Sequence, residues 1–149
     1  MTDVLILIGT ESGTAEMVGE CLVDKFTRLG VGAEMMEGSD ADGDDLASRD
    51  VVLVCTATHG MGELPSNIQP LADALEDGQP DFSALRYGVI ALGDQTYQET
   101  FCKGGKVIDK LFAGLGAKRV GERLEIDACT QPLPDEEAVK WAEEWVSLL

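Results

Sequence analysis

A short stretch of small and hydroxylated residues, GTESGTAE at positions 9–16, has the composition of a phosphate-binding loop. It offers the hydroxyls of Thr10, Ser12 and Thr14, and it lies between an apolar run and a segment with helical spacing. Amides at the start of such a helix, together with the helix dipole, can bind a phosphate without a lysine. Gly13 lets the backbone approach the phosphate oxygens closely. Because the stretch lacks both the lysine of a P-loop and the GxGxxG spacing of a dinucleotide-binding loop, we predict a phosphate site built from neutral dipoles.

Two further polar segments, TATHGMGELPSN (56–67) and LGDQTYQETFC (92–102), also follow apolar runs directly. Both are rich in residues that expose backbone amides or offer short hydrogen-bonding side chains. An ordinary turn would explain any one of the three segments. In an open sheet of parallel strands, however, all three would lie at the carboxyl edge, where ligands bind. We therefore expect one ligand site shared by the three segments.

Continuous apolar runs indicate strands that are covered on both faces, as in a parallel sheet. The segments between them have apolar residues at spacings of three and four, and Gly30 reads as a helix stop. The predicted strands cover 4–8, 31–36, 51–55, 87–92 and, more weakly, 120–126; the predicted helices cover 15–29, 68–75, 107–115 and 138–149; and the acidic segment 37–50 is expected to be a solvated connection. With right-handed crossovers, this alternation predicts an α/β fold. We expect a single domain, 1–149, with an open doubly wound five-stranded parallel sheet and helices on both faces.

The composition restricts the classes of partner. The chain has 149 residues, 44% hydrophobic content and a formal net charge of −17. Such a charge repels nucleic acid and anionic membranes, so we expect neither as a partner; it favours a basic protein surface or serves solubility alone. The apolar N-terminal run is interrupted by Asp3 and ends after about five residues, too few for a signal peptide or a membrane span. We therefore expect a cytoplasmic protein.

The cysteines do not form a recognisable redox or metal motif. Cys21, Cys55, Cys102 and Cys129 show neither a CxxC pair nor a His/Cys cluster with metal-ligand spacing. We expect reduced, mostly buried thiols and no metal site. The Phe and Trp residues at helical spacing are expected in the core.

The three polar segments together resemble those of the flavodoxin family, and the resemblance covers essentially the whole chain. It is closest to the small MioC-type flavodoxins and to the FMN domains of diflavin reductases. TESGTA (10–15) is similar to the family's phosphate loop, ATHGMGE (57–63) to the loop along the inner face and N5 edge of the flavin, and LGDQTYQETFC to the third flavin loop. The resemblance implies that the cofactor is FMN. The cofactor-binding residues it implies are Thr10, Glu11, Ser12, Gly13, Thr14, Ala15, Thr56, Ala57, Thr58, His59, Gly60, Met61, Gly62, Leu92, Gly93, Asp94, Tyr97, Phe101 and Cys102.

Two of these residues would flank the flavin ring. Tyr97 falls where the family places an aromatic residue stacked on the isoalloxazine. His59, the only histidine, stands where diflavin domains usually carry Tyr; its imidazole can acquire a charge near neutral pH, or it only caps a turn. The resemblance also implies that the Gly60–Met61 peptide turns its carbonyl towards flavin N5 on reduction. The short connection after Ile126 leaves no room for the insertion of long-chain flavodoxins, so the chain resembles the short-chain type.

The resemblance implies a low-potential one-electron carrier rather than an enzyme, and it assigns no catalytic residue. The flavin would supply the redox chemistry, and the protein would control binding, solvent access and electrostatics. The implied partners are the basic surface of an NADPH-dependent flavodoxin reductase and acceptor redox enzymes, with the carrier acting as a monomer.

Two alternatives remain: an FMN-dependent NAD(P)H oxidoreductase, and a flavodoxin-fold regulatory module without flavin. A two-component receiver shares the architecture, but it needs acidic residues after the first strand and a phosphorylatable Asp after the third. This chain has Thr10-Glu11 and Cys55-Thr56 at those places, which argues against a receiver.

Overall fold

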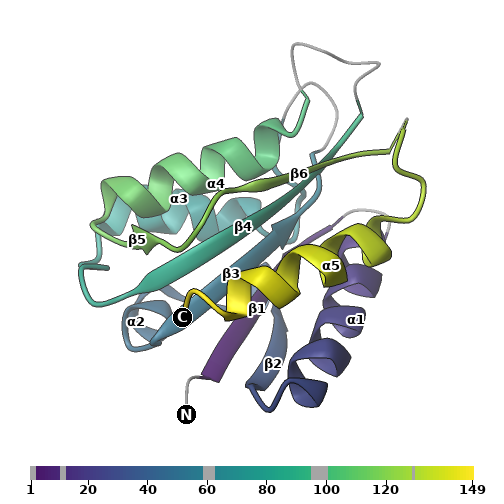
Figure 1. Cartoon of the computed structure of the whole chain (residues 1–149). Helices are drawn as coiled ribbons and strands as arrows, with labels where there is room; N and C mark the ends of the chain where they lie inside the picture. Colours follow the sequence, from purple (N-terminus) through teal and green to yellow (C-terminus); the bar gives the residue numbers. More distant parts are fainter. Residues whose placement is uncertain (1–2, 11–12, 59–62, 95–100, 129) are drawn as a thin grey trace.

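A computed structural model of the chain describes residues 3–10, 13–58, 63–94, 101–128 and 130–149 (Figure 1). Strands and helices alternate along these residues, as the sequence predicts. The elements are β1 (Asp3–Gly9), α1 (Thr14–Arg28), β2 (Gly32–Glu37), η1 (Gly38–Asp40), α2 (Gly43–Ala47), β3 (Val51–Thr56), α3 (Gln69–Gly78), β4 (Arg86–Gly93), α4 (Lys103–Gly114), β5 (Lys118–Arg119), β6 (Leu124–Asp127) and α5 (Pro134–Val146). Among the described residues, no helix combines the length and apolar character that crossing a membrane requires.

The strands form one parallel sheet in the order β2-β1-β3-β4-β5, and β6 also pairs with β4. From β1 the chain passes to β2 on one side, then crosses back to β3 on the other side of β1 and continues outward to β4 and β5. The direction therefore reverses between β1 and β3, which confirms the predicted doubly wound order. Ligands bind beyond the carboxyl ends of the strands at such a reversal.

Helices cover both faces of the sheet, which explains the continuous apolar runs of the strands. Side chains of a strand point alternately to its two faces. In β1, Val4, Ile6 and Ile8 belong to the core that α1 and α5 cover, whereas Leu5 and Leu7 belong to the core that α3 and α4 cover. Figure 1 shows these two helix pairs on opposite sides of the strands.

The predicted helices form with small shifts at their ends. α1 is followed by Gly30, whose φ of 77° lies in the left-handed region that glycine adopts without strain, and the amide of Val31 donates to the carbonyl of Phe26. Three aromatic residues of the helices are buried as expected, Phe26, Phe112 and Trp145. Trp141 on α5 is only partly buried and packs against the core.

The fifth strand differs from the single strand predicted over 120–126. Its position in the sheet is filled by two short strands, β5 and β6, which both pair with β4. Between them Gly121 has a φ of 68°. The carbonyl of Val120 accepts a hydrogen bond of 2.9 Å from Trp145 Nε1. The carbonyl of Val120 is thus bonded to Trp145 of α5, and Gly121 has a positive φ. Together these features interrupt the regular strand geometry between β5 and β6.

The acidic segment 37–50 is more ordered than the expected solvated connection. It forms η1 and α2, and the side chain of Leu46 is fully buried against the α3 side of the core. Asp42 caps α2, because its Oδ1 accepts a hydrogen bond of 2.8 Å from the amide of Asp45. The prediction was wrong because one leucine among many acidic residues gives no periodic signal.

Candidate functional site

The three polar segments leave the sheet at one edge. β1 ends at Gly9, β3 at Thr56 and β4 at Gly93, and all three strands run in the same direction (Figure 1). Gly9 lies opposite Thr56 in the pairing of β1 with β3, so the first two loops begin side by side. The fold therefore brings the predicted loops together, as the sequence requires.

The first loop is organised by Thr10 and Gly13. The amide of Gly13 donates a hydrogen bond of 2.8 Å to Thr10 Oγ1, and Gly13 has a φ of 91°, a conformation that strains other residues. α1 begins at Thr14, and Met17 donates the first helical hydrogen bond to the carbonyl of Gly13. The amides before Met17 thus belong to the open first turn of α1, whose dipole favours an anion.

Thr10 has a different role in this loop from the predicted one. The residue pattern predicts a hydroxyl that donates to a ligand, whereas in the structure the Thr10 oxygen accepts from the amide of Gly13 and so fixes the turn before α1. Its amide donates a hydrogen bond of 2.7 Å to Asn67 Oδ1, which ties the first loop to the end of the second. Ala15 is buried beneath the loop. Glu11 and Ser12 lie outside the described residues.

The second loop is held between its neighbours. The amide of Ala57 donates to the carbonyl of Gly9 at 2.9 Å. Thr58 Oγ1 donates to the carbonyl of Leu92 at 3.1 Å and accepts from the amide of Gly104 at 3.0 Å. One hydroxyl thus joins the second loop to β4 and to the start of α4. The next four predicted residues, His59, Gly60, Met61 and Gly62, lie outside the described residues.

The third loop returns to the sheet at Cys102. A Cβ on Gly93 would lie 2.5 Å from the amide nitrogen of Cys102, so only glycine allows this close approach. Cys102 Sγ is buried and lies 3.3 Å from the carbonyl of Ala91, to which it can donate. Of the other predicted residues here, Asp94 ends the described part of the loop and Phe101 resumes it, half-buried. Tyr97 lies outside the described residues.

The described cysteines are free thiols, of which Cys55 and Cys102 are buried. Burial raises the pKa of Cys55 to about 12. Burial, together with the charge of Glu125, raises the pKa of Cys102 to about 12. Both thiols therefore stay protonated near neutral pH and pack in the core rather than acting as nucleophiles. Cys21 is partly buried, and Cys129 lies outside the described residues.

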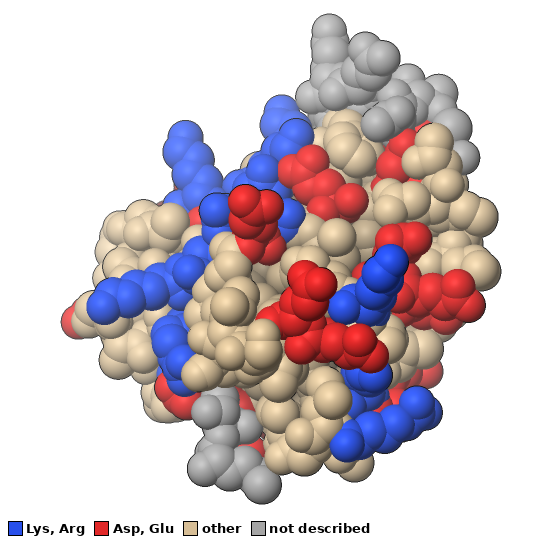
Figure 2. Space-filling view, viewed as in Figure 1, with Lys and Arg blue, Asp and Glu red and all other residues tan. Residues whose placement is uncertain are grey.

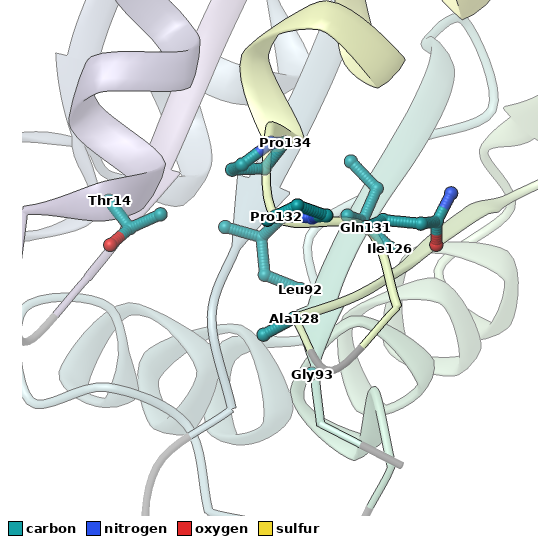
Figure 3. A pocket seen from close by; sticks show the side chains of 8 residues that line it. All are labelled: Thr14, Leu92, Gly93, Ile126, Ala128, Gln131, Pro132 and Pro134. Carbon is teal, nitrogen blue, oxygen red and sulfur yellow. The ribbon is translucent and has the colours of Figure 1, made fainter.

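A cavity of about 170 Å³ lies between the first and third loops (Figure 3). Thr14 borders it from the start of α1, and Leu92 and Gly93 border it from the end of β4. Its remaining wall comes from the connection between β6 and α5. The lining residues on this wall are Ile126, Ala128, Gln131, Pro132 and Pro134.

The wall formed by the connection between β6 and α5 was not among the predicted parts of the site. The amide of Ala128 donates to the carbonyl of Gly93 at 2.8 Å, so the wall is attached to the third loop. Asp127 and Gln131 exchange two hydrogen bonds, from Asp127 N to Gln131 Oε1 at 2.9 Å and from Gln131 N to the carbonyl of Asp127 at 2.7 Å. The only signal in the sequence was the pair Pro132 and Pro134, which restricts the backbone before α5.

The arrangement suits a phosphorylated ligand that spans several loops. The first loop supplies a glycine turn and an open helix start for a phosphate. The second and third loops are fixed to each other through Thr58, and the cavity beside Gly93 offers a mostly apolar wall. Within the described ranges, no group of three or more His, Cys, Asp or Glu side chains is placed to hold a metal ion.

Comparisons with known proteins agree with this geometry. The family model described as Flavodoxin matches residues 6–141. The chain is similar to Protein MioC of Escherichia coli K12, with 38% identity over 100% of this chain and 99% of that protein. It is also similar to Flavodoxin YqcA of the same organism, with 41% identity over 100% and 99% of the two chains. Among solved structures, a cysteine-to-alanine mutant of flavodoxin from Pseudomonas aeruginosa matches with a TM-score of 0.87, 38% identity and 99% coverage of both chains.

Proposed function

Because this chain belongs to the flavodoxin family and is an FMN-binding electron carrier, we propose that it takes electrons from a reductase and passes them singly to acceptor enzymes. The observation that carries the proposal is the first loop, where Gly13 turns at positive φ directly before α1 and is held by Thr10. This loop fits the terminal phosphate of FMN. FMN supplies the redox chemistry, and the chain supplies binding, orientation and shielding.

In this proposal each loop has a separate task. Thr10 shapes the turn, and the amides at the start of α1 with the hydroxyls of Ser12 and Thr14 bind the phosphate. Thr58 holds the start of the second loop against β4 and the start of α4, so that the second and third loops would both border the flavin site. The remaining proposed contacts are Glu11, Ala15, Thr56, Ala57, Gly62, Leu92, Gly93, Asp94, Phe101 and Cys102.

The ring contacts belong to residues outside the described ranges. We propose Tyr97 as the outer stacking residue and His59 as the inner neighbour of the ring. The Gly60–Met61 peptide is proposed to present its carbonyl to flavin N5 after reduction. These assignments are supported by the resemblance to the family and by the described starts of the two loops, Thr58 and Gly93, which lie at the same edge of the sheet.

The proposed donor is the basic surface of an NADPH-dependent flavodoxin reductase. A carrier with a net charge of −17 is attracted to a basic surface over several ångströms, and brief docking suits a shuttle that must leave again. In this role the chain is a monomer and has no substrate of its own. The electrons pass through the cofactor rather than through a side chain.

Titration of the apo-protein with FMN, FAD and riboflavin tests the proposal. We expect FMN to bind at least about tenfold more tightly than riboflavin, because only FMN brings a phosphate to the first loop. Equal affinity for FMN and riboflavin would contradict the proposal that the first loop binds the phosphate of FMN. Adding NADPH to the holo-protein without a reductase tests the enzyme alternative, since rapid loss of flavin colour would show an NADPH oxidoreductase instead of a carrier.

A further inference from the structure

The positive charges of this acidic chain are concentrated in one segment. Six of the 11 Lys and Arg residues lie between residues 103 and 123. The same segment holds only two of the 28 carboxylates, Asp109 and Glu122. The charge distribution along the chain is therefore asymmetric, with one positive segment in a strongly negative protein.

The fold gathers these charges on one surface. Lys103, Lys106 and Lys110 follow at spacings of three and four on α4, so they lie along one side of the helix, and all three are exposed. Lys118 and Arg119 form β5, which lies beside α4 at the edge of the sheet, and they are exposed as well. These five residues are called the α4–β5 basic patch. Figure 2 shows Lys and Arg side chains gathered over α4 and β5, at the upper left of the view.

Most of the patch is not neutralised by carboxylates. Arg119 Nη1 donates to the buried carboxylate of Asp109 at 2.6 Å. In contrast, none of the four lysines of the patch forms an ion pair with the described part of the chain, although Lys25, Arg49 and Arg86 elsewhere do. Lys106 Nζ lies 5.9 Å from the centre of the Phe101 ring. Within the described ranges, the four lysines therefore keep a positive charge that no carboxylate pairs, and this charge can attract a partner.

Protection of the sheet edge explains only part of the patch. Charged residues on an edge strand prevent pairing with the edge of another molecule, and this accounts for Lys118 and Arg119. The three lysines of α4 are on a helix and protect no strand. Lys103 follows Phe101 and Cys102 directly, so the helical part of the patch begins at the third loop of the flavin site.

We propose that the α4–β5 basic patch docks an acidic redox protein and holds it beside the flavin site. This inference rests on the proposed electron-carrier function and adds a positive docking surface to a chain whose net charge of −17 favours a basic donor. A partner with a carboxylate-rich face would be steered to the patch and would meet the third loop at the end where α4 begins. The carrier could thus meet a basic donor and an acidic acceptor with different faces.

Stopped-flow electron transfer from the photoreduced FMN-loaded protein tests the proposal. The acceptors are oxidised rubredoxin, a small acidic iron protein, and oxidised cytochrome c, a small basic haem protein. In each reaction one electron leaves the reduced flavin and converts Fe(III) of the acceptor to Fe(II). The test variant carries Lys110→Glu and Lys118→Glu. The matched control carries Arg28→Glu and Lys140→Glu, which change the net charge equally at exposed positions on α1 and α5.

At low ionic strength we expect the test variant to react with rubredoxin at least about threefold more slowly than the control, and the difference to vanish as salt screens the charges. With cytochrome c, the test variant should be no slower than the control. Carbodiimide cross-linking followed by mass spectrometry should join rubredoxin carboxylates to lysines of the patch in the wild type. Equal rubredoxin rates for the two variants, or cross-links only outside the patch, would overturn the docking proposal.

Two other results have distinct meanings. If the holo-protein reduces neither acceptor, the carrier function itself fails, and the cross-links still report on the patch. If sedimentation shows wild-type oligomers that the test variant lacks, the patch binds a second copy of this chain, and the proposed acidic redox partner is wrong. Duplex DNA that binds the wild type but not the test variant would overturn the proposal in the same way.

Discussion

At the scale of single residues, Thr10 shows how a side chain can serve a ligand without touching it. Its oxygen accepts from the amide of Gly13 and so sets the turn in front of α1. We expect Thr10→Val, which keeps the shape but removes the acceptor, to weaken FMN binding about tenfold, equivalent to ~1.4 kcal/mol. Riboflavin binding should change little, because riboflavin brings no phosphate to this loop.

The matched control is Thr27→Val. Thr27 lies exposed on α1, and its hydroxyl donates to the carbonyl of Val23 one turn earlier, so it takes no part in the turn at Gly13. Fluorescence titrations with both ligands should give wild-type affinities for this control. If Thr10→Val weakened FMN and riboflavin equally, the residue would support the whole fold rather than the phosphate loop.

Asp109 is a buried carboxylate whose partners predict a pH dependence. Tyr87 donates to its Oδ1 at 2.6 Å, and Arg119 and Arg123 both donate to its Oδ2. Burial alone would raise the pKa of Asp109, but these hydrogen bonds outweigh it and lower the pKa below its ordinary value. A carboxyl group with a lowered pKa stabilises the fold above its unfolded pKa of about 3.9, and this contribution is lost as the pH falls through the folded pKa.

We therefore expect Asp109→Asn to reduce the free energy of unfolding by ~1–3 kcal/mol at neutral pH, because two arginines and a buried tyrosine lose an anionic partner. The difference from the wild type should shrink as the pH is lowered below about 4. Urea unfolding from pH 7 down to pH 3 measures this. Asp77→Asn, on the exposed side of α3, is the control. A difference that stays constant with pH would show that the charge of Asp109 contributes nothing.

Part of the candidate site can be predicted from residue types alone. The types and places of the loop residues followed from strand ends and glycines, and the structure brings Gly13, Thr58 and Gly93 to one edge. The direction of the hydrogen bond between Thr10 and Gly13 depends on rotamers, which a pattern of residue types does not contain. The cavity wall around Gln131 could not be predicted, because it depends on a contact between distant segments, from Ala128 to Gly93.

At the scale of elements, regular hydrophobic periodicity predicted the strands and helices correctly. The two predictions that failed concern segments where this periodicity is weak or interrupted. The strands with continuous apolar runs and the helices with spacings of three and four form where predicted. The fifth strand is divided because Trp145 Nε1 donates a hydrogen bond to the carbonyl of Val120. This contact joins α5 to the sheet, and no local sequence pattern predicts it. The helix α2 could not be predicted within the acidic segment, because Leu46 is the one fully buried apolar side chain there and a single apolar residue gives no periodicity.

The short helix α2 is held to the core by one buried side chain, Leu46. We expect Leu46→Ala to lower the free energy of unfolding by ~2–5 kcal/mol, since it leaves a cavity under α2 in the core beside α3. Leu148→Ala is the matched control, because Leu148 is 59% exposed near the C-terminus and should change stability little. Urea unfolding followed by tryptophan fluorescence compares the two. Equal effects would restore the view of 37–50 as a solvated connection.

At the scale of the whole molecule, the surplus of carboxylates acts on stability as well as on partners. With 28 acidic and only 11 basic residues, the net repulsion is stronger in the compact fold than in the extended unfolded chain. The ion pairs of the described residues lie mostly at the surface, where each contributes little. Net repulsion should therefore dominate the response of the fold to salt.

We expect the free energy of unfolding to rise, on the order of 1 kcal/mol, when NaCl increases from about 0.01 M to 0.15 M, because the Debye length falls from ~30 Å to ~8 Å and screens the repulsion. Urea is the suitable denaturant, since it is uncharged and leaves the ionic strength under control. The variant Glu20→Gln with Asp77→Asn removes two exposed charges on α1 and α3 and should show a smaller rise. If added salt instead lowered the stability, attractive pairs such as those around Asp109 would outweigh the net charge, and the acidity would cost the fold nothing.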